Sequence, residues 1–301
     1  MILFGILAAS GAGAAAGVAG YVAGGYTGSG VTTVDKFAFS DDSRTTLVTG
    51  LSSARHGLAG MSNSGIAGYA AGGTDGSATD TVDKFAFSSD SRTTLGTGLS
   101  SARPSLAGMS NSGVAGYAAG GLSNGTTVDK FAFPSDSRTT LGTGLSSARG
   151  ALAGMSNSGV AGYAAGGSNF STVDKFAFPS DSRTTLGTGL SGGNYSPSGF
   201  SNSGVAGYVA GGYDGGVISR VDKFAFPSDS RTTLGAGLSS ARRDSAGMSN
   251  SGVAGYAAGG DDGSNFSTVD KFAFPSDSRT TLGTGLSSAR DYSAGFQNEA
   301  L

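Results

Sequence analysis

One unit of 45 to 48 residues recurs six times along the chain, and this repetition constrains the fold more than any other feature. Every copy holds a GYxAGG motif, then VDKFAF, then DSRTTL, and most copies end in SSAR. The tyrosines of the first motif lie 48, 48, 46, 45 and 48 residues apart. They are Tyr21, Tyr69, Tyr117, Tyr163, Tyr208 and Tyr256. Tandem repeats with a period in this range are typical of folds in which each copy is one supersecondary unit.

Each unit contains four short segments that read as β-strands. In the third copy they span 106–110, 114–119, 128–133 and 139–145, with Gly, Asn, Pro and Ser between them. Turn residues of this kind separate strands, and no apolar stripe recurs at the three-to-four-residue spacing of a helix. Four strands per repeat at this period indicate a propeller blade. We therefore predict an all-β, six-bladed propeller with four antiparallel strands per blade.

Side-chain size and the two chain ends support a closed ring. The first two strands of a unit are mostly Ala and Gly, whereas the third carries bulky pairs such as Phe131 and Phe133, as a blade that widens away from its axis requires. The chain enters at a second strand (18–23) and finishes on a lone first strand (292–296). We expect this C-terminal strand to complete blade one, which leaves no free sheet edge.

The repeat resembles the kelch family. The shared order is an Arg, a small-residue strand with an aromatic residue, a Gly-Gly doublet, a V-D-K-F strand, a polar turn and a last strand, and it covers the chain from Gly17 to Phe296. The family's following Trp is missing, and its region reads TTL at 139–141. The resemblance implies a divergent kelch-like propeller, and no partner of a kelch protein is carried over. The doublets are Gly24-Gly25, Gly72-Gly73, Gly120-Gly121, Gly166-Gly167, Gly211-Gly212 and Gly259-Gly260.

The composition argues against catalysis. The chain has no Cys and a single histidine, His56, in a loop where we expect it to be exposed. Thiolate chemistry is excluded, and a histidine-based metal cluster or triad has too few residues. Asp136 and Arg138 of the DSR motif recur in every copy, whereas an active site is one asymmetric constellation. Their repetition favours turn formation and pairing between strands. We predict a non-enzymatic protein with no catalytic residue and no cofactor.

Metal and nucleic-acid binding are also not expected. The acidic, glycine-rich loops at 75–80, 214–215 and 261–263 leave calcium open as an alternative. None of them has the spacing of an EF-hand, and Asp-Gly is an ordinary turn sequence. The formal net charge is −2, and no basic stretch of the kind that follows a phosphate backbone is present.

The copies differ from one another on only one face of the predicted ring. The turns between strands one and two and between strands three and four are almost identical in all copies. The second-to-third loops and the blade-to-blade connections vary in length and content, and they hold Tyr, Phe and Asn among Gly and Ser, a composition suited to recognition. Neutral drift of surface loops is the alternative. The predicted ligand-binding residues are Tyr26, His56, Asn124, Phe170, Asn194, Tyr195, Tyr213, Arg243, Phe266 and Tyr292.

The first 16 residues, MILFGILAASGAGAAA, form an apolar Ala/Gly-rich segment outside the predicted propeller of residues 17–301. No Lys or Arg precedes the apolar run, as a signal peptide would require, and the run is too short to span a bilayer. We predict a docking segment for assembly, with a leader or membrane anchor as alternatives. Its docking residues are Ile2, Leu3, Phe4, Ile6 and Leu7.

Near-identical repeats rich in Gly, Ser, Thr and Ala, behind an apolar N-terminus, look like those of bacteriophage virion proteins. That resemblance implies a tail-fibre or other virion surface protein. The expected partners are other virion proteins at the N-terminal segment and a host-surface glycan or protein at the variable loops, and homo-oligomers remain open. Alternatives are an extracellular adhesion module on a bacterial surface, a purely structural virion component, and an intracellular interaction scaffold.

Overall fold

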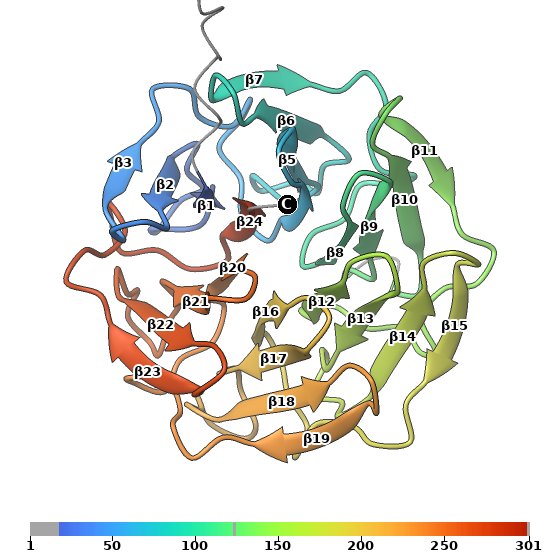
Figure 1. Ribbon diagram of the computed structural model, residues 1–301. Coiled ribbons are helices and arrows are strands. Elements are labelled where there is room, and N and C mark those ends of the chain that lie inside the picture. The colour runs from blue at the N-terminus through green and yellow to red at the C-terminus, as the bar shows by residue number, and fades with distance from the viewer. Residues whose placement is uncertain (1–17, 123–124, 300–301) are drawn as a thin grey trace, which may run out of the picture.

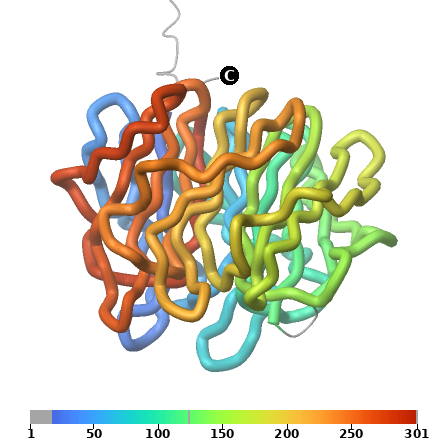
Figure 2. The backbone as a smooth tube through the Cα atoms, turned by 90° about the horizontal axis from the view of Figure 1, so that it is seen from below, coloured from blue at the N-terminus to red at the C-terminus, as the bar shows by residue number. Residues whose placement is uncertain are grey.

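The computed structural model describes residues 18–122 and 125–299. The docking residues of the N-terminal segment, Gly17 and Asn124 lie outside these ranges. Within them the chain forms six four-stranded antiparallel sheets arranged around a central axis (Figure 1). Figure 2 shows the ring edge-on, with connecting loops at both of its faces. The predicted all-β, six-bladed architecture is confirmed.

The strands follow one order in every blade, from the axis to the rim. Blade one contains β24 (Ala294–Asn298), β1 (Ala19–Ala23), β2 (Val34–Ala38) and β3 (Arg44–Thr46). Blade two contains β4 (Ala59–Asn63), β5 (Ala67–Ala71), β6 (Val82–Ala86) and β7 (Ser91–Thr94), and blade three β8 (Ala107–Asn111), β9 (Ala115–Ala119), β10 (Val128–Ala132) and β11 (Ser137–Thr140). Blade four contains β12 (Ala153–Asn157), β13 (Ala161–Ala165), β14 (Val173–Ala177) and β15 (Ser182–Thr185). Blade five contains β16 (Ser198–Asn202), β17 (Ala206–Ala210), β18 (Val221–Ala225) and β19 (Ser230–Thr233), and blade six β20 (Ala246–Asn250), β21 (Ala254–Ala258), β22 (Val269–Ala273) and β23 (Ser278–Thr281).

Closure occurs where the sequence predicts it. β24 pairs with β1 in the register Ala19↔Asn298 to Ala23↔Ala294, so the C-terminal strand is the innermost strand of blade one. It begins two residues later than predicted, because Tyr292 takes a left-handed backbone conformation (φ 52°) before the strand starts.

The fourth strand of each blade is the element predicted least well. In blade three β11 is Ser137–Thr140, not 139–145. Asp136 has a left-handed backbone (φ 54°) that turns the chain at once, so Ser137 already pairs with Ala132. The strand then ends before Gly142, where the chain leaves the sheet.

The hydrophobic core lies between blades. The ring of Tyr69 in blade two stacks on Phe133 of blade three with centroids 5.1 Å apart, and the same pairing of tyrosine and phenylalanine recurs around the ring. The tyrosine hydroxyl donates to Asp136 Oδ1 (2.8 Å), and Lys84 Nζ donates to Oδ2 of the same carboxylate (2.6 Å). Burial raises the pKa of Tyr69 far above its usual value. The aspartate of the DSR motif therefore both turns the chain and links neighbouring blades.

A second repeated contact fixes five of the six blade connections to the next blade. Arg103 and Asp129 are both fully buried, and Arg103 Nη2 lies 2.9 Å from Asp129 Oδ2. Burial alone would raise the pKa of Asp129, but hydrogen bonds from Thr140 and the Ser100 amide, with the charge of Arg103, lower it below its usual value. Five interfaces have this pair: Arg55–Asp83, Arg103–Asp129, Arg149–Asp174, Arg242–Asp270 and Arg290–Asp35.

Candidate functional site

The strand order separates the two kinds of loop onto opposite faces of the ring. We call the face with the second-to-third loops and the connections the variable face, and the other the uniform face. Among the described residues, the variable face comprises loops 24–33, 72–81, 120–122 with 125–127, 166–172, 211–220 and 259–268 and connections 47–58, 95–106, 141–152, 186–197, 234–245 and 282–293. The uniform face comprises turns 64–66, 112–114, 158–160, 203–205, 251–253, 39–43, 87–90, 133–136, 178–181, 226–229 and 274–277.

Loops and connections from different blades lie side by side on the variable face. Backbone bridges join Tyr195 to Tyr213, and Arg243 to Asp261. A further bridge joins Tyr26 to the last connection. Segments far apart in the sequence therefore form one continuous surface.

Six of the predicted ligand-binding residues gather on this surface, and we call them the aromatic cluster. The ring centroid of His56 lies 5.0 Å from that of Tyr26 and 6.0 Å from that of Tyr292. The guanidinium carbon of Arg243 lies 5.8 Å from the ring centroid of Tyr213. Burial raises the pKa of Tyr292 beyond its usual range, and the nearby Asp244 and Tyr195 raise it further. The cluster consists of Tyr26, His56, Tyr195, Tyr213, Arg243 and Tyr292.

The exposed fractions of these residues show which of them a partner can contact. Tyr26 and Tyr213 are each 37% exposed, so their rings are open to a partner. His56 is half-buried between two tyrosines, not exposed as expected from its loop, and burial lowers its pKa. Arg243 lies 3.3 Å from carboxylate oxygens of both Asp244 and Asp261.

Three of the predicted residues do not belong to the cluster. Phe170 is exposed on the blade-four loop, and Phe266 is half-buried with its ring 5.8 Å from the guanidinium carbon of Arg242. Asn194 is only 3% exposed; its Nδ2 donates to the Gly211 carbonyl and its Oδ1 accepts from the Tyr213 amide. Because the main chain occupies both polar ends of this side chain, we no longer count Asn194 as a ligand-binding candidate.

Asn194 stands where the other five copies have the buried arginine, and a second substitution compensates for it. Arg220, where the other copies have Thr, brings its Nε to 3.9 Å from Asp222 and its Nη1 to 3.4 Å from Asp214. Gly192 makes room for this arrangement, since a Cβ there would lie 2.5 Å from Asp214 Oδ2 and 3.2 Å from Arg220 Nη2. In blade five the positive charge near Asp222 therefore comes from loop 211–220, whereas in the other blades it comes from the connection.

Replacing Arg220 with threonine should destabilise the blade-five interface. Asp222 would lose the cation that takes the place of the missing arginine, so we expect the free energy of unfolding to fall by about 1–3 kcal/mol. Adding Asn194→Arg should recover most of this loss by restoring the pair found elsewhere in the ring. Urea unfolding of the wild type, the single variant and the double variant measures both effects. A double variant no more stable than the single one would show that the two substitutions are independent.

A closed ring of backbone hydrogen bonds surrounds the axis on the variable face. Six residues, one per blade, have left-handed backbones, with φ between 52° and 68°. Each donates its N–H to the carbonyl of the preceding one over 2.6–3.0 Å, and the last bond closes the circle. We call this ring, with the cavity beneath it, the channel mouth. Its residues are Gly57, Ser105, Ala151, Ser196, Asp244 and Tyr292.

One side of the channel mouth is apolar and the other is polar. The residues that follow the ring are Leu58, Leu106 and Leu152 in three successive blades, and then Pro197, Ser245 and Ser293. Together they line a cavity of about 70 Å³. On the polar side, burial raises the pKa of Asp244 to about 7 and that of Asp291 to about 6. The aromatic cluster borders this polar side, since Tyr292 belongs to both.

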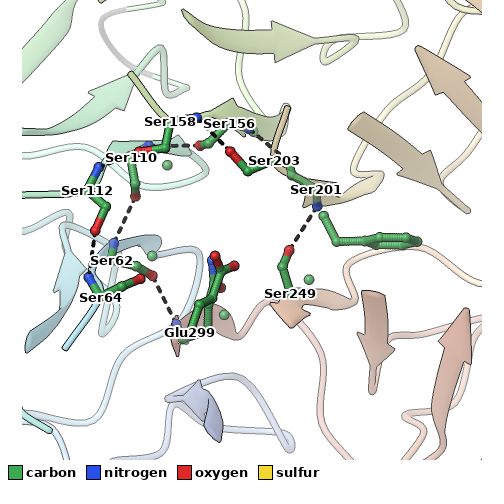
Figure 3. A pocket seen from close by; sticks show the side chains of 18 residues that line it. Ser62, Ser64, Ser110, Ser112, Ser156, Ser158, Ser201, Ser203, Ser249 and Glu299 are labelled. Carbon is green, nitrogen blue, oxygen red and sulfur yellow. Dashed lines mark hydrogen bonds between the residues drawn. The ribbon is translucent and has the colours of Figure 1, made fainter. Parts of the chain in front are cut away.

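The opposite end of the channel is lined by serine hydroxyls (Figure 3). In four of the inner strands (β4, β8, β12 and β16) a serine N–H donates to the serine Oγ of the next blade, as in Ser62 N to Ser110 Oγ (2.8 Å), and in β24 Gln297 N donates to Ser62 Oγ (2.9 Å). Glu299 projects into this space, and burial raises its pKa to about 7. These serines lie in or beside the nearly identical turns between strands one and two, and the sequence did not mark them as channel-lining residues.

Comparison with known proteins supports the fold. No model of a known protein family matches the sequence, and no curated protein matches it. A solved structure titled "Structure of YjhT" superposes with a TM-score of 0.68, covering 87% of this chain and 97% of that chain at 13% identity. The chain is a six-bladed β-propeller. At this identity the likeness shows the fold alone, so the kelch-like and virion resemblances stay predictions.

Among residues 18–122 and 125–299, no group of three or more His, Asp or Glu side chains is placed to hold a metal ion. Within the same ranges, no helix is long and apolar enough to cross a membrane.

Proposed function

We propose that this propeller is a non-enzymatic virion surface or tail-fibre protein whose variable face binds a glycan of the host envelope. The observation that supports it most is the aromatic cluster, which collects exposed tyrosines and a charged network from loops of four blades beside the channel mouth. The uniform face repeats the same turns around the ring.

The chemistry of the cluster suits a carbohydrate better than a protein. Tyrosine rings offer an apolar face and a hydroxyl, which match the apolar edge and the hydroxyls of a sugar. The charged network of Arg243, Asp244 and Asp261 supplies donors and acceptors fixed by their own pairing. A rigid ring holds these groups in place before binding, which reduces the entropy lost on association.

The virion assignment gives the N-terminal segment and the propeller different roles. The N-terminal segment would dock to other virion proteins, and the propeller would present the variable face to the host. This part of the proposal comes from the sequence resemblance. An adhesion module on a bacterial surface would use the same face, whereas a purely structural virion component would not use it.

Competition for adsorption tests the proposal. Host cells are incubated with the purified protein, and adsorption of the particle that carries it is then measured. We expect the wild-type protein to block adsorption, and a variant whose divergent loops and connections are replaced by the SNFS and GAL versions to block it poorly while remaining folded. Absence of the protein from purified particles would contradict the virion assignment. Equal blocking by both proteins would contradict the role of the variable face.

A further inference from the structure

Arginine nitrogens without a hydrogen bond are buried all around the ring, but the other buried side-chain atoms that lack one belong to a single region. Apart from arginine nitrogens, every such side-chain atom in residues 18–122 and 125–299 belongs to His56, Asp244, Ser245 or Asp291. Neither carboxylate oxygen of Asp244 has a hydrogen bond of ordinary geometry, although Oδ2 lies 3.3 Å from Arg243 Nε and the residue is only 6% exposed. Buried polar groups are normally satisfied, so a cluster of exceptions requires a cause.

These residues share one side of the channel mouth. They belong to the connections that enter blades two, six and one, which are neighbours around the ring. Asp244 and Ser245 line the cavity of the mouth together with Tyr292. Two of the four residues therefore line the cavity at this end of the channel, and the other two directly precede Gly57 and Tyr292 of the ring.

The repeat itself shows that this polarity is not required by the fold. The equivalents of Asp244 and Ser245 in blade four are Ala151 and Leu152, and the ring of backbone bonds closes through both kinds of residue. Placing a carboxylate where alanine suffices costs stability, because the group is removed from water without full compensation. Such a cost is expected where a side chain serves binding.

We propose that the channel mouth is the primary subsite of the variable face and holds the terminal residue of a neutral sugar chain. The inference rests on the proposed function and names its substrate class. The ionised carboxylate of Asp244 accepts hydrogen bonds, and sugar hydroxyls can donate them. The leucine side of the mouth takes the apolar edge of the same ring. The cavity of about 70 Å³ accepts the end of a sugar and leaves the rest of the chain to the aromatic cluster.

Above pH 7, where Asp244 and Asp291 are ionised, charge disfavours an acidic sugar at this subsite. Asp244, Asp261 and Asp291 face one cation, Arg243, which already lies 3.3 Å from two of them. An incoming carboxylate or phosphate would meet an excess of negative charge. A neutral sugar donates to the acids without adding charge.

The test uses methyl glycosides of galactose, mannose, glucose and fucose, with methyl glucuronide as the acidic comparison, in a calorimetric titration. We expect the wild type to bind at least one neutral glycoside and to bind the glucuronide more weakly. Asp244→Asn removes a charged acceptor without changing shape, so affinity should fall about 10- to 100-fold. Asp262→Asn, at an exposed position of the same face, is the matched control and should bind like the wild type.

Thermal stability shows whether Asp244→Asn binds weakly because a ligand contact is lost or because the protein is unfolded. The folded pKa of Asp244 is about 7, above its usual value of 3.8, so the folded state gains stability as pH falls from 7 towards 4 and is penalised above 7. Asp244→Asn has no such penalty. It should therefore melt higher than the wild type at pH 8, with the difference shrinking towards pH 4. The groups around it, Arg243, Asp291 and Tyr292, are common to both proteins.

The outcomes distinguish this inference from the proposed function. If the wild type binds no neutral glycoside, or if Asp244→Asn binds as well as the wild type, the subsite is wrong. The same holds if the glucuronide binds best. Envelope binding that persists under these results would leave the proposed function standing, whereas a wild-type protein that binds neither glycosides nor envelope would contradict both.

Discussion

Replacing Gly108 with alanine should prevent the ring from closing properly and lower the free energy of unfolding by about 3 kcal/mol or more. A Cβ at this position would lie 1.9 Å from the carbonyl oxygen of Gly60 in the neighbouring inner strand. The obstacle is backbone, and it cannot move away without changing the spacing of two blades. The equivalent glycines of the other blades are packed against backbone in the same way, so the neighbouring blades cannot shift to relieve the clash.

Urea unfolding measures this effect, and Gly142→Ala is the matched control. No atom lies within 4 Å of a Cβ at Gly142, and its backbone is not in the left-handed region. The control should be as stable as the wild type or slightly more stable, because alanine restricts the unfolded chain. If Gly108→Ala matched Gly142→Ala, the inner strands would not be packed backbone against backbone.

Replacing Arg103 with methionine should cost about 3–5 kcal/mol, because it leaves the Asp129 carboxylate buried without its main cation. Arg103 also donates to the carbonyls of Gly120 and Ala118, which would lose their donors. Without the cation the pKa of Asp129 should rise, so the loss of stability should shrink as pH is lowered and the carboxyl group is protonated.

The matched control for this prediction is Arg138→Met. Arg138 lies 3.6 Å from the other oxygen of Asp129, but its side chain is 27% exposed to solvent. Removing an exposed partner should cost less than about 1 kcal/mol. Thermal unfolding at pH 8 and pH 4 compares the two variants. Equal losses at both positions would mean that burial of Arg103 does not set the strength of its pair.

The fold was predictable because the same strand and turn motifs occur six times in the sequence. One copy of GYxAGG or VDKFAF would be a weak signal, but six copies at regular spacing identify the blade, and the lone first strand at the C-terminus predicts closure. The fourth strand was misplaced because its start depends on a left-handed aspartate, which the residue type alone does not reveal. The Arg103–Asp129 pair joins residues 26 positions apart, and only the folded connection brings them together.

The candidate site was predictable in part. Variation among copies identified the loops, and six of the ten candidates do gather in the aromatic cluster. Which loops become neighbours depends on the order of blades around the ring, so the sequence could not separate Phe170 from the cluster. The channel mouth was missed because its ring uses Gly, Ser, Ala, Asp and Tyr with the same left-handed backbone. No residue pattern marks such a ring.

The most direct test of the central claim is binding of the purified protein to envelope polysaccharide from the host, measured for three proteins side by side. One variant carries Tyr26→Thr and Tyr213→Thr, the residue that the second copy has at the equivalent position, Thr74. The other carries Val114→Ser and Val160→Ser, which remove exposed apolar side chains from the uniform face. We predict that the tyrosine variant loses binding and that the valine variant binds like the wild type. Equal binding by all three proteins, or loss in the valine variant alone, would contradict recognition through the variable face.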